Sequence, residues 1–195
     1  MMYYIVFDLE LNSKAYKSKL PNEVIEIGAV RLDEKLELTD SFQSYIQPKI
    51  HRKLFPLIKR KTKITQESIN EADSFRNVLN RFREWCGCDS ILCSWGPDDI
   101  HHLKQNCKLN RVSAKWIKKT FDIQKYFSQL YEAPPGHRYS LSKALEALKI
   151  KPEEDLHRAY VDAKYTALVF VNICDEKYIN MLSGRKSGEF LCSKI

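Results

Sequence analysis

The segment YYIVFDLELN at residues 3–12 places two carboxylates, Asp8 and Glu10, two positions apart near the end of an apolar stretch. The aromatic and β-branched residues before them predict a strand, in which side chains two positions apart share one face, about 7 Å from each other. Two like charges on a largely buried face repel each other and lose hydration unless a cation neutralises them. The pair is therefore a candidate cation site. The alternative is that the strand ends at Phe7 and both acids face water.

Carboxylates recur at the ends of two other predicted elements. Asp98 and Asp99 follow the short apolar segment SILCSW (90–95), and His157 and Asp162 lie at the start of the helical segment HRAYVDAKYTA. Residues five apart on a helix differ by about 140° in direction, so His157 can approach Asp162 only from the loop before the helix. We therefore expect three separate segments to bring acids toward one site.

The elements that position these residues follow from hydrophobic periodicity, capping residues and turn signals. Strands are expected at 3–10, at two places within 23–48 on either side of a DEK turn, at 90–95 and within 115–123. Helices are expected within 64–72 with Thr65 as cap, at 74–86 behind Ser74, at 96–107, around 123–131, at 140–150 behind Ser140, and at 158–173. This order predicts an α/β fold with one mixed sheet.

The size of the chain sets its domain organisation. Its 195 residues, 44% of them hydrophobic, support one complete core, so we expect a single domain at 1–177 and a C-terminal tail at 178–195. The N-terminus lacks the pattern of a signal peptide, and the longest apolar run, ALVFVNIC, is too short to span a bilayer. We therefore expect a soluble cytoplasmic protein without a membrane partner.

The six cysteines do not follow a zinc-binding pattern. They contain no C-x-x-C pair, and the CGC at 86–88 with Cys93 and Cys107 does not match the usual ligand spacings. We expect reduced, mostly buried thiols, and a zinc site that also uses His101 and His102 is the alternative.

Positive charge is concentrated in two stretches that contain no acid. The net charge is +7; seven lysines and arginines lie within 49–63, and six more lie within 100–121. Such clusters are typical of phosphate-binding surfaces, although a face kept basic for solubility is the alternative for either stretch alone. Together the two stretches favour a polyanionic partner.

The ordered segments FDLE, NEVIEIGAVRLD, SWGPDDIHHL and HRAYVDAKYTA resemble the DEDDh family of 3′-to-5′ exonucleases, which includes RNase T and the polymerase proofreading subunit. The similarity is greatest to the branch of histone-mRNA and small-RNA exonucleases and their bacterial relatives. It implies a ribonuclease H-like fold, a mixed five-stranded sheet flanked by helices. It also implies a nuclease that binds two Mg²⁺ or Mn²⁺ ions and releases nucleoside 5′-monophosphates from the 3′ end of single-stranded nucleic acid, with RNA favoured over DNA.

Carried over by position, the resemblance implies the general base His157 and four metal-binding carboxylates: Asp8, Glu10, Asp99 and Asp162. Asp99 is preferred over Asp98 because it fits the W-G-x-x-D-x-x-x-L pattern. Carboxylates suit this role because Mg²⁺ and Mn²⁺ prefer oxygen ligands.

Substrate contacts are implied in the same way. Leu9 and Leu11 flank the ligands and are expected to wedge against a base. Asn12 stands where many family members have threonine, and its amide is expected to hydrogen-bond a terminal sugar or phosphate. Trp95 is expected to pack in the core, with stacking on substrate as the alternative.

Within the first basic stretch, Lys59 and Arg60 are expected to contact backbone phosphate upstream of the cleaved nucleotide. The expected partner is single-stranded RNA or DNA with a free 3′ end, and no protein partner is evident. Three alternatives stay open: a DNA proofreading exonuclease, a nucleic-acid-binding or regulatory module without turnover, and a metal-binding protein whose basic loops dock an acidic protein.

Overall fold

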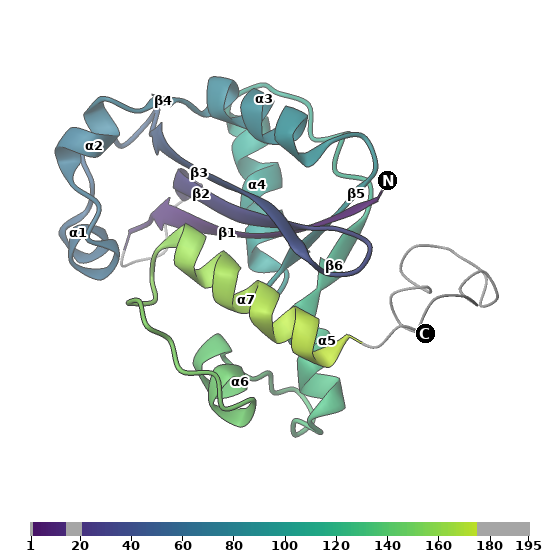
Figure 1. The fold of residues 1–195 in the computed structure, drawn as a ribbon. Coiled ribbons are helices and arrows are strands. Elements are labelled where there is room, and N and C mark those ends of the chain that lie inside the picture. The colour runs from purple at the N-terminus through teal and green to yellow at the C-terminus, as the bar shows by residue number, and fades with distance from the viewer. Residues whose placement is uncertain (1, 15–20, 175–195) are drawn as a thin grey trace.

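The computed structural model describes residues 2–14 and 21–174. In this part of the chain six strands form one mixed sheet in the order β4-β3-β2-β1-β5-β6 (Figure 1). The strands are β1 Tyr3–Asn12, β2 Glu23–Leu32, β3 Leu38–Gln47, β4 Asp73–Ser74, β5 Ser90–Ser94 and β6 Thr120–Asp122. The expected tail at 178–195 lies outside the described residues.

Strand β1 lies inside the sheet and carries the first pair of acids. It pairs antiparallel with β2 and parallel with β5. In its register with β2, Asp8 lies opposite Gly28 and Glu10 lies opposite Glu26, and the register shifts between Glu10 and Leu11. Directly opposite residues of an antiparallel pair point to the same face. Gly28 and Glu26 are therefore the cross-strand neighbours of the two acids.

Seven helices accompany the sheet in the described residues: α1 Pro56–Thr62, α2 Gln66–Asn70, α3 Phe75–Cys86, α4 Asp98–Leu109, α5 Ile123–Leu130, α6 Leu141–Ala147 and α7 Ala159–Ile173. Figure 1 shows α3 and α4 on one face of the sheet and α7 on the other, with α6 outside α7. Helices α1 and α2 lie beyond the end of the sheet at which β1 finishes (Figure 1).

The hydrophobic core follows the alternation of β1. Tyr4 and Val6 pack on the face that α7 covers, while Ile5 and Phe7 pack with α3 on the other face. All four side chains have no exposed surface. Because both faces of β1 are buried up to Phe7, the core holds the strand in place. This fixes the direction in which the side chains of the acids after Phe7 point.

The expected architecture is confirmed, with two additions. The five expected strands are present, and the two-residue strand β4 extends the sheet at its edge beside β3. The caps Thr65, Ser74 and Ser140 each accept a backbone N–H of the helix that they precede. Helix α1 was not expected: its sequence PLIKRKT has only a short apolar pattern, and Ile58 and Thr62 are buried only because the tertiary fold covers them.

Candidate active site

Three carboxylates meet at the end of β1. Asp8 and Glu10 project from one face of that strand, and Asp162 lies in the first turn of α7. One oxygen from each of the three lies within 4.8 Å of the others. This spacing brings together acids that are more than 150 positions apart in the sequence.

Asp99 joins the cluster from the first turn of α4. Its Oδ1 accepts the backbone N–H of Leu9, between the two β1 acids, at 3.2 Å. The neighbouring Asp98 is exposed. The structure therefore turns Asp99 toward the cluster and Asp98 toward solvent, as the motif preference for Asp99 requires.

The four acids hold their protons more strongly than free carboxyls do. Burial, followed by the charges of Asp99, Asp162 and Glu10, raises the pKa of Asp8 well above its usual value. Burial raises the pKa of both Glu10 and Asp99 to about 7, and it also raises the pKa of Asp162. Like charges that share a desolvated site behave in this way when no cation is bound.

His157 lies in the loop immediately before α7, as the five-residue offset from Asp162 requires. Its backbone N–H donates to both carboxylate oxygens of Asp162, at 3.3 and 3.2 Å. The residue has a φ of 81°, a left-handed conformation that is unusual for histidine. Its exposed side chain reaches Asp162 closely enough to lower the pKa of that carboxyl. His157 is thus at the rim of the cluster and accessible to solvent.

Gly28 allows α7 to approach the sheet so closely. A Cβ at this position would lie 2.0 Å from the backbone nitrogen of Tyr160 and 2.2 Å from the carbonyl carbon of Ala159. No side chain fits there, so only glycine lets the first turn of α7 rest on β2. The contact places Asp162 beside the β1 acids.

The cluster fits a hard divalent cation. Its donors are carboxylate oxygens, the ligand type that Mg²⁺ and Mn²⁺ prefer, and a bound cation would offset the burial and mutual repulsion that raise the pKa of Asp8. Among the described residues, this is the one group of three or more acids, histidines or cysteines close enough to hold a metal. The alternative zinc site at His101 and His102 is not among the metal-binding groups of the described residues.

Three of the expected substrate contacts, Leu9, Leu11 and Trp95, pack in or against the hydrophobic core. Leu9 is part of the buried core under α3, and Leu11 packs against it. Trp95 packs against the core on the other face of the sheet, where its ring centroid lies 5.8 Å from that of Phe127. Leu9 is 6% exposed, so little of its side chain is available to contact a base. Trp95 agrees with its core interpretation.

Asn12 requires a correction. Its side chain is 1% exposed, and it donates to the carbonyl oxygens of His51 and Lys53 at 2.9 and 3.1 Å and accepts the N–H of Phe55 at 3.0 Å. The expected hydrogen bond to a terminal sugar or phosphate does not fit, because the amide is already used to hold the chain segment that leads into α1. The short polar side chain gave no sign of this role in the sequence.

The first basic stretch lies next to the carboxylates. Lys59, Arg60 and Lys61 form the last turn of α1, and all three are exposed. The positive charge of Lys61 counteracts the raised pKa of both Glu10 and Asp162, so its ammonium lies near both carboxylates. The sequence marked Lys59 and Arg60 as phosphate contacts, and the structure adds Lys61, which no sequence pattern distinguishes from its neighbours.

Five of the six cysteines lie in the described residues. Cys86, Cys93 and Cys107 are buried, Cys88 is exposed and Cys174 is partly buried, and none of these five forms a disulfide in the described part of the chain. Burial raises the pKa of Cys86 to about 12 and that of Cys107 to about 11, which makes both thiols poor nucleophiles. Of the helices in residues 2–14 and 21–174, none combines the length and apolar character needed to cross a membrane.

The mixed sheet, with acids from β1, α4 and α7 brought together at the end of β1, is a ribonuclease H-like fold with a carboxylate cluster. The chain belongs to the exonuclease family of RNase T, whose model matches residues 5–170. The match includes every residue of the carboxylate cluster and His157.

Two curated relatives illustrate the range of this family. The 3′-5′ exoribonuclease 1 of Rattus norvegicus is 26% identical over 185 residues, which cover 89% of this chain and 53% of the relative. The PolC-type DNA polymerase III of Clostridium perfringens is 28% identical over an alignment of 200 positions, which covers 94% of this chain but 13% of the polymerase. The chain thus spans about half the length of the exoribonuclease relatives.

Among solved structures, the nuclease domain of 3′hExo, described as a DEDDh family member bound to rAMP, superimposes with a TM-score of 0.80. The two chains are 26% identical, and the match covers 88% of this chain and 90% of that domain. The cell-death related nuclease CRN-4, at 22% identity and a TM-score of 0.78, shares the fold.

Proposed function

We propose that this chain is a metal-dependent 3′-to-5′ exonuclease that shortens single-stranded nucleic acid and releases nucleoside 5′-monophosphates. The observation that carries the proposal is the convergence of Asp8, Glu10 and Asp162 within 4.8 Å, with Asp99 beside them and His157 at the rim. Family membership and the 3′hExo superposition support the same reading.

The residues divide the chemistry between them. Asp8, Glu10, Asp99 and Asp162 would hold two Mg²⁺ or Mn²⁺ ions. When bound, such ions lower the pKa of a coordinated water and stabilise the departing 3′ oxygen. His157 accepts the proton of the attacking water, a role that imidazole side chains commonly fill as general bases. The breaking bond is that between the phosphorus and the 3′ oxygen, so the phosphate stays on the released nucleotide.

RNA is the favoured substrate, with a free 3′ end as its entry point. This preference rests on the similarity to the exoribonuclease relatives and to a solved 3′-exonuclease that shows 3′-end specific recognition of a histone mRNA stem-loop. We expect the exposed cations of α1 to contact the phosphates next to the terminal nucleotide, a contact that does not depend on sequence.

The proposal is tested with purified protein and 5′-labelled single-stranded RNA and DNA in Mg²⁺, Mn²⁺ or EDTA. We expect a ladder that shortens from the 3′ end with either ion, is absent in EDTA and is lost in Asp162→Ala. Asp98→Ala is the matched control, because Asp98 is an exposed acid next to Asp99 and its removal leaves the cluster intact. If RNA and DNA both persist under every metal condition, the nuclease proposal is wrong.

The second candidate is a DNA proofreading exonuclease, which the similarity to PolC-type polymerases favours. The same assay, with a mismatched DNA primer–template added, separates the two: faster shortening of RNA supports the first, and faster removal of the mismatched 3′ nucleotide supports the second. Oligonucleotide binding without shortening would point to the non-catalytic module.

A further inference from the structure

Helix α7 carries Asp162 but has no capping side chain of its own. The residue at its N-cap position is Arg158, which makes no side-chain cap hydrogen bond to the helix. The first N–H groups of a helix need acceptors, and a negative charge near them is favourable. The acceptor for Ala159 comes instead from Glu26 on β2, at 3.2 Å and 133 positions earlier in the sequence.

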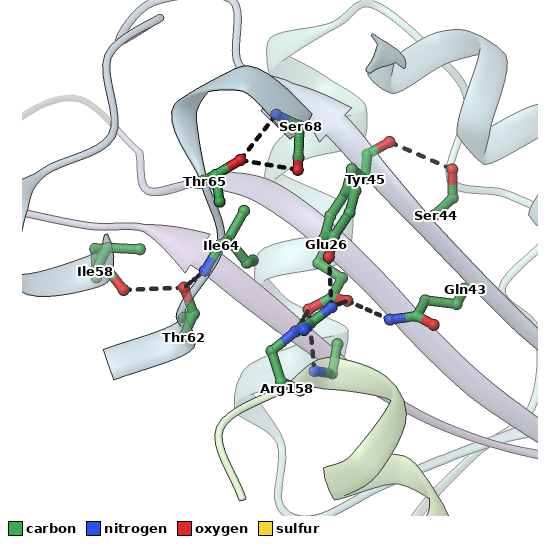
Figure 2. Close-up of polar contacts among 11 residues, drawn as sticks. Glu26, Gln43, Ser44, Tyr45, Ile58, Thr62, Ile64, Thr65, Ser68 and Arg158 are labelled. Atoms are coloured by element: carbon green, nitrogen blue, oxygen red, sulfur yellow. Dashed lines mark hydrogen bonds and ion pairs between the residues drawn. The ribbon is translucent and has the colours of Figure 1, made fainter. Parts of the chain in front are cut away.

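Glu26 is fully buried, and its carboxylate lies among several hydrogen-bond donors (Figure 2). Its carboxylate accepts two hydrogen bonds from the guanidinium of Arg158, at 3.2 and 2.9 Å, and one from the amide of Gln43 at 2.7 Å. Arg158 also donates to the hydroxyl of Tyr45 at 2.5 Å. A buried charge with this many partners fixes the geometry around it.

This network holds the backbone next to His157 from the sheet side. Asp162 holds the same turn from the helix side, because it accepts the N–H of His157. The left-handed φ of 81° at His157 is a costly conformation that persists only when the surroundings determine it. Glu26 and Asp162 supply those surroundings from two sides.

Resting on the proposed exonuclease, we infer that Glu26, acting through Arg158 and the first N–H of α7, is a positioning residue that sets the place of His157 over the carboxylate cluster. Glu26 contacts no reacting atom in this arrangement. It acts through the loop before α7. Gln43 hydrogen-bonds Glu26, and Tyr45 hydrogen-bonds Arg158.

Kinetics give the first test. In Glu26→Gln, which keeps the size of the side chain but removes the ion pair, kcat should fall by about 10- to 100-fold, the range seen when a residue that orients a metal-site ligand is replaced. KM should change much less, because the α1 cations remain in place. The double variant Glu26→Gln/His157→Ala should be no slower than His157→Ala alone, since both changes act on one group.

A second readout needs neither metal nor turnover. In the metal-free protein, the ring C–H resonances of His157 should shift or broaden in Glu26→Gln, while those of the distant, exposed His137 stay unchanged. Asp40→Asn is the matched control, because it breaks another carboxylate–guanidinium pair on β2, between Asp40 on β3 and Arg31 at the other end of β2. It should leave the His157 signals and kcat as in the natural protein.

Loss of one partner from a buried ion pair can unfold a protein, so two milder variants accompany Glu26→Gln. Tyr45→Phe removes only the hydroxyl that Arg158 contacts, and Arg158→Lys keeps the charge but loses the two-point contact. Both should move the His157 signals and kcat in the same direction by smaller amounts. Unchanged His157 resonances in the folded variants would overturn the inference. Absence of nuclease activity in the natural protein would instead overturn the proposed function and leave this spectroscopic test valid.

Discussion

Glu10 on β1 and Glu26 on β2 lie directly opposite each other across the antiparallel pair, and both side chains are buried. Their charges are balanced from different directions. Arg158 forms an ion pair with Glu26 at 2.9 Å, whereas Lys61 is the cation that most favours the ionised form of Glu10. Two residues that face each other across one strand pair therefore have different roles. Glu10 faces the candidate metal site, and Glu26 holds the helix that completes this site.

The buried carboxyls of the candidate metal site predict that the metal-free protein loses stability as the pH rises from acid toward neutral values. Burial raises the pKa of Glu10 and Asp99 to about 7, so both stay protonated in the fold at pH values that ionise them in the unfolded chain. Their contribution to the free energy of unfolding is full below about pH 4 and is lost as pH rises toward about 7. In EDTA, the melting temperature should fall as the pH rises across this range. The fall should be smaller in Glu10→Gln.

Added Mg²⁺ should reverse this trend, because the metal binds the deprotonated cluster and displaces protons. The stabilisation by Mg²⁺ should therefore grow from about pH 5 to about pH 8 in the natural protein and be small in Glu10→Gln. Stabilisation by Mg²⁺ that does not depend on pH would contradict a site built from these carboxyls.

Gly28→Ala should damage the site without touching an acid. The added Cβ would lie 2.0 Å from a backbone atom of α7, so the first turn of the helix must move away from the sheet. Overpacking of this kind costs about 1–3 kcal/mol or more. We expect a lower melting temperature together with loss of Mg²⁺ stabilisation. Gly136→Ala, where the surroundings are open but φ is positive, should cost stability alone and keep the response to Mg²⁺.

Lys61→Ala should weaken substrate binding more than it slows cleavage. The lysine is exposed beside Glu10 and Asp162, so its removal takes away a phosphate contact but no ligand. The slope of log affinity against log salt concentration for single-stranded RNA should become shallower by about 0.7, the value for one lost phosphate contact. Fluorescence anisotropy with EDTA present measures this without cleavage.

Lys115→Ala, in the second basic stretch, is the control for Lys61, because both are exposed lysines of equal charge. An equal change of slope in both variants would mean that the whole surface attracts RNA by charge alone, and the specific role of Lys61 would then be wrong.

Glu23→Gln should loosen the segment that leads to α1. The Glu23 carboxylate is 2% exposed and accepts the backbone N–H groups of Lys49, Ile50 and His51 at 2.6 to 2.8 Å. Loss of hydrogen bonds to a buried charge costs about 1.5–3 kcal/mol. Hydrogen exchange should become faster at those three amides, and RNA binding should weaken. Glu67→Gln, an exposed acid on α2, should change neither; protected amides in Glu23→Gln would contradict the anchoring role.

Much of the fold was predictable because each strand and helix carries its own local pattern. The alternation in β1 and the caps Thr65, Ser74 and Ser140 depend on neighbours in the sequence, and the structure confirms them. The candidate acids were also predictable, since their order along the chain follows the family motif. Helix α1 escaped prediction because seven residues are too few for a periodic pattern to stand out from a basic run.

The sequence by itself determined which acids could meet: Asp8, Glu10, Asp99 and Asp162 stand at the ends of elements that local patterns define. Only the tertiary structure decided the neighbours of those acids. It turned Asn12 from a substrate contact into a buried anchor, placed Lys61 beside the carboxylates, and paired Glu26 with Arg158 across 132 positions. The physical reason is that hydrogen bonds and charge pairs between distant segments depend on how helices pack on a sheet, and no local pattern records that packing.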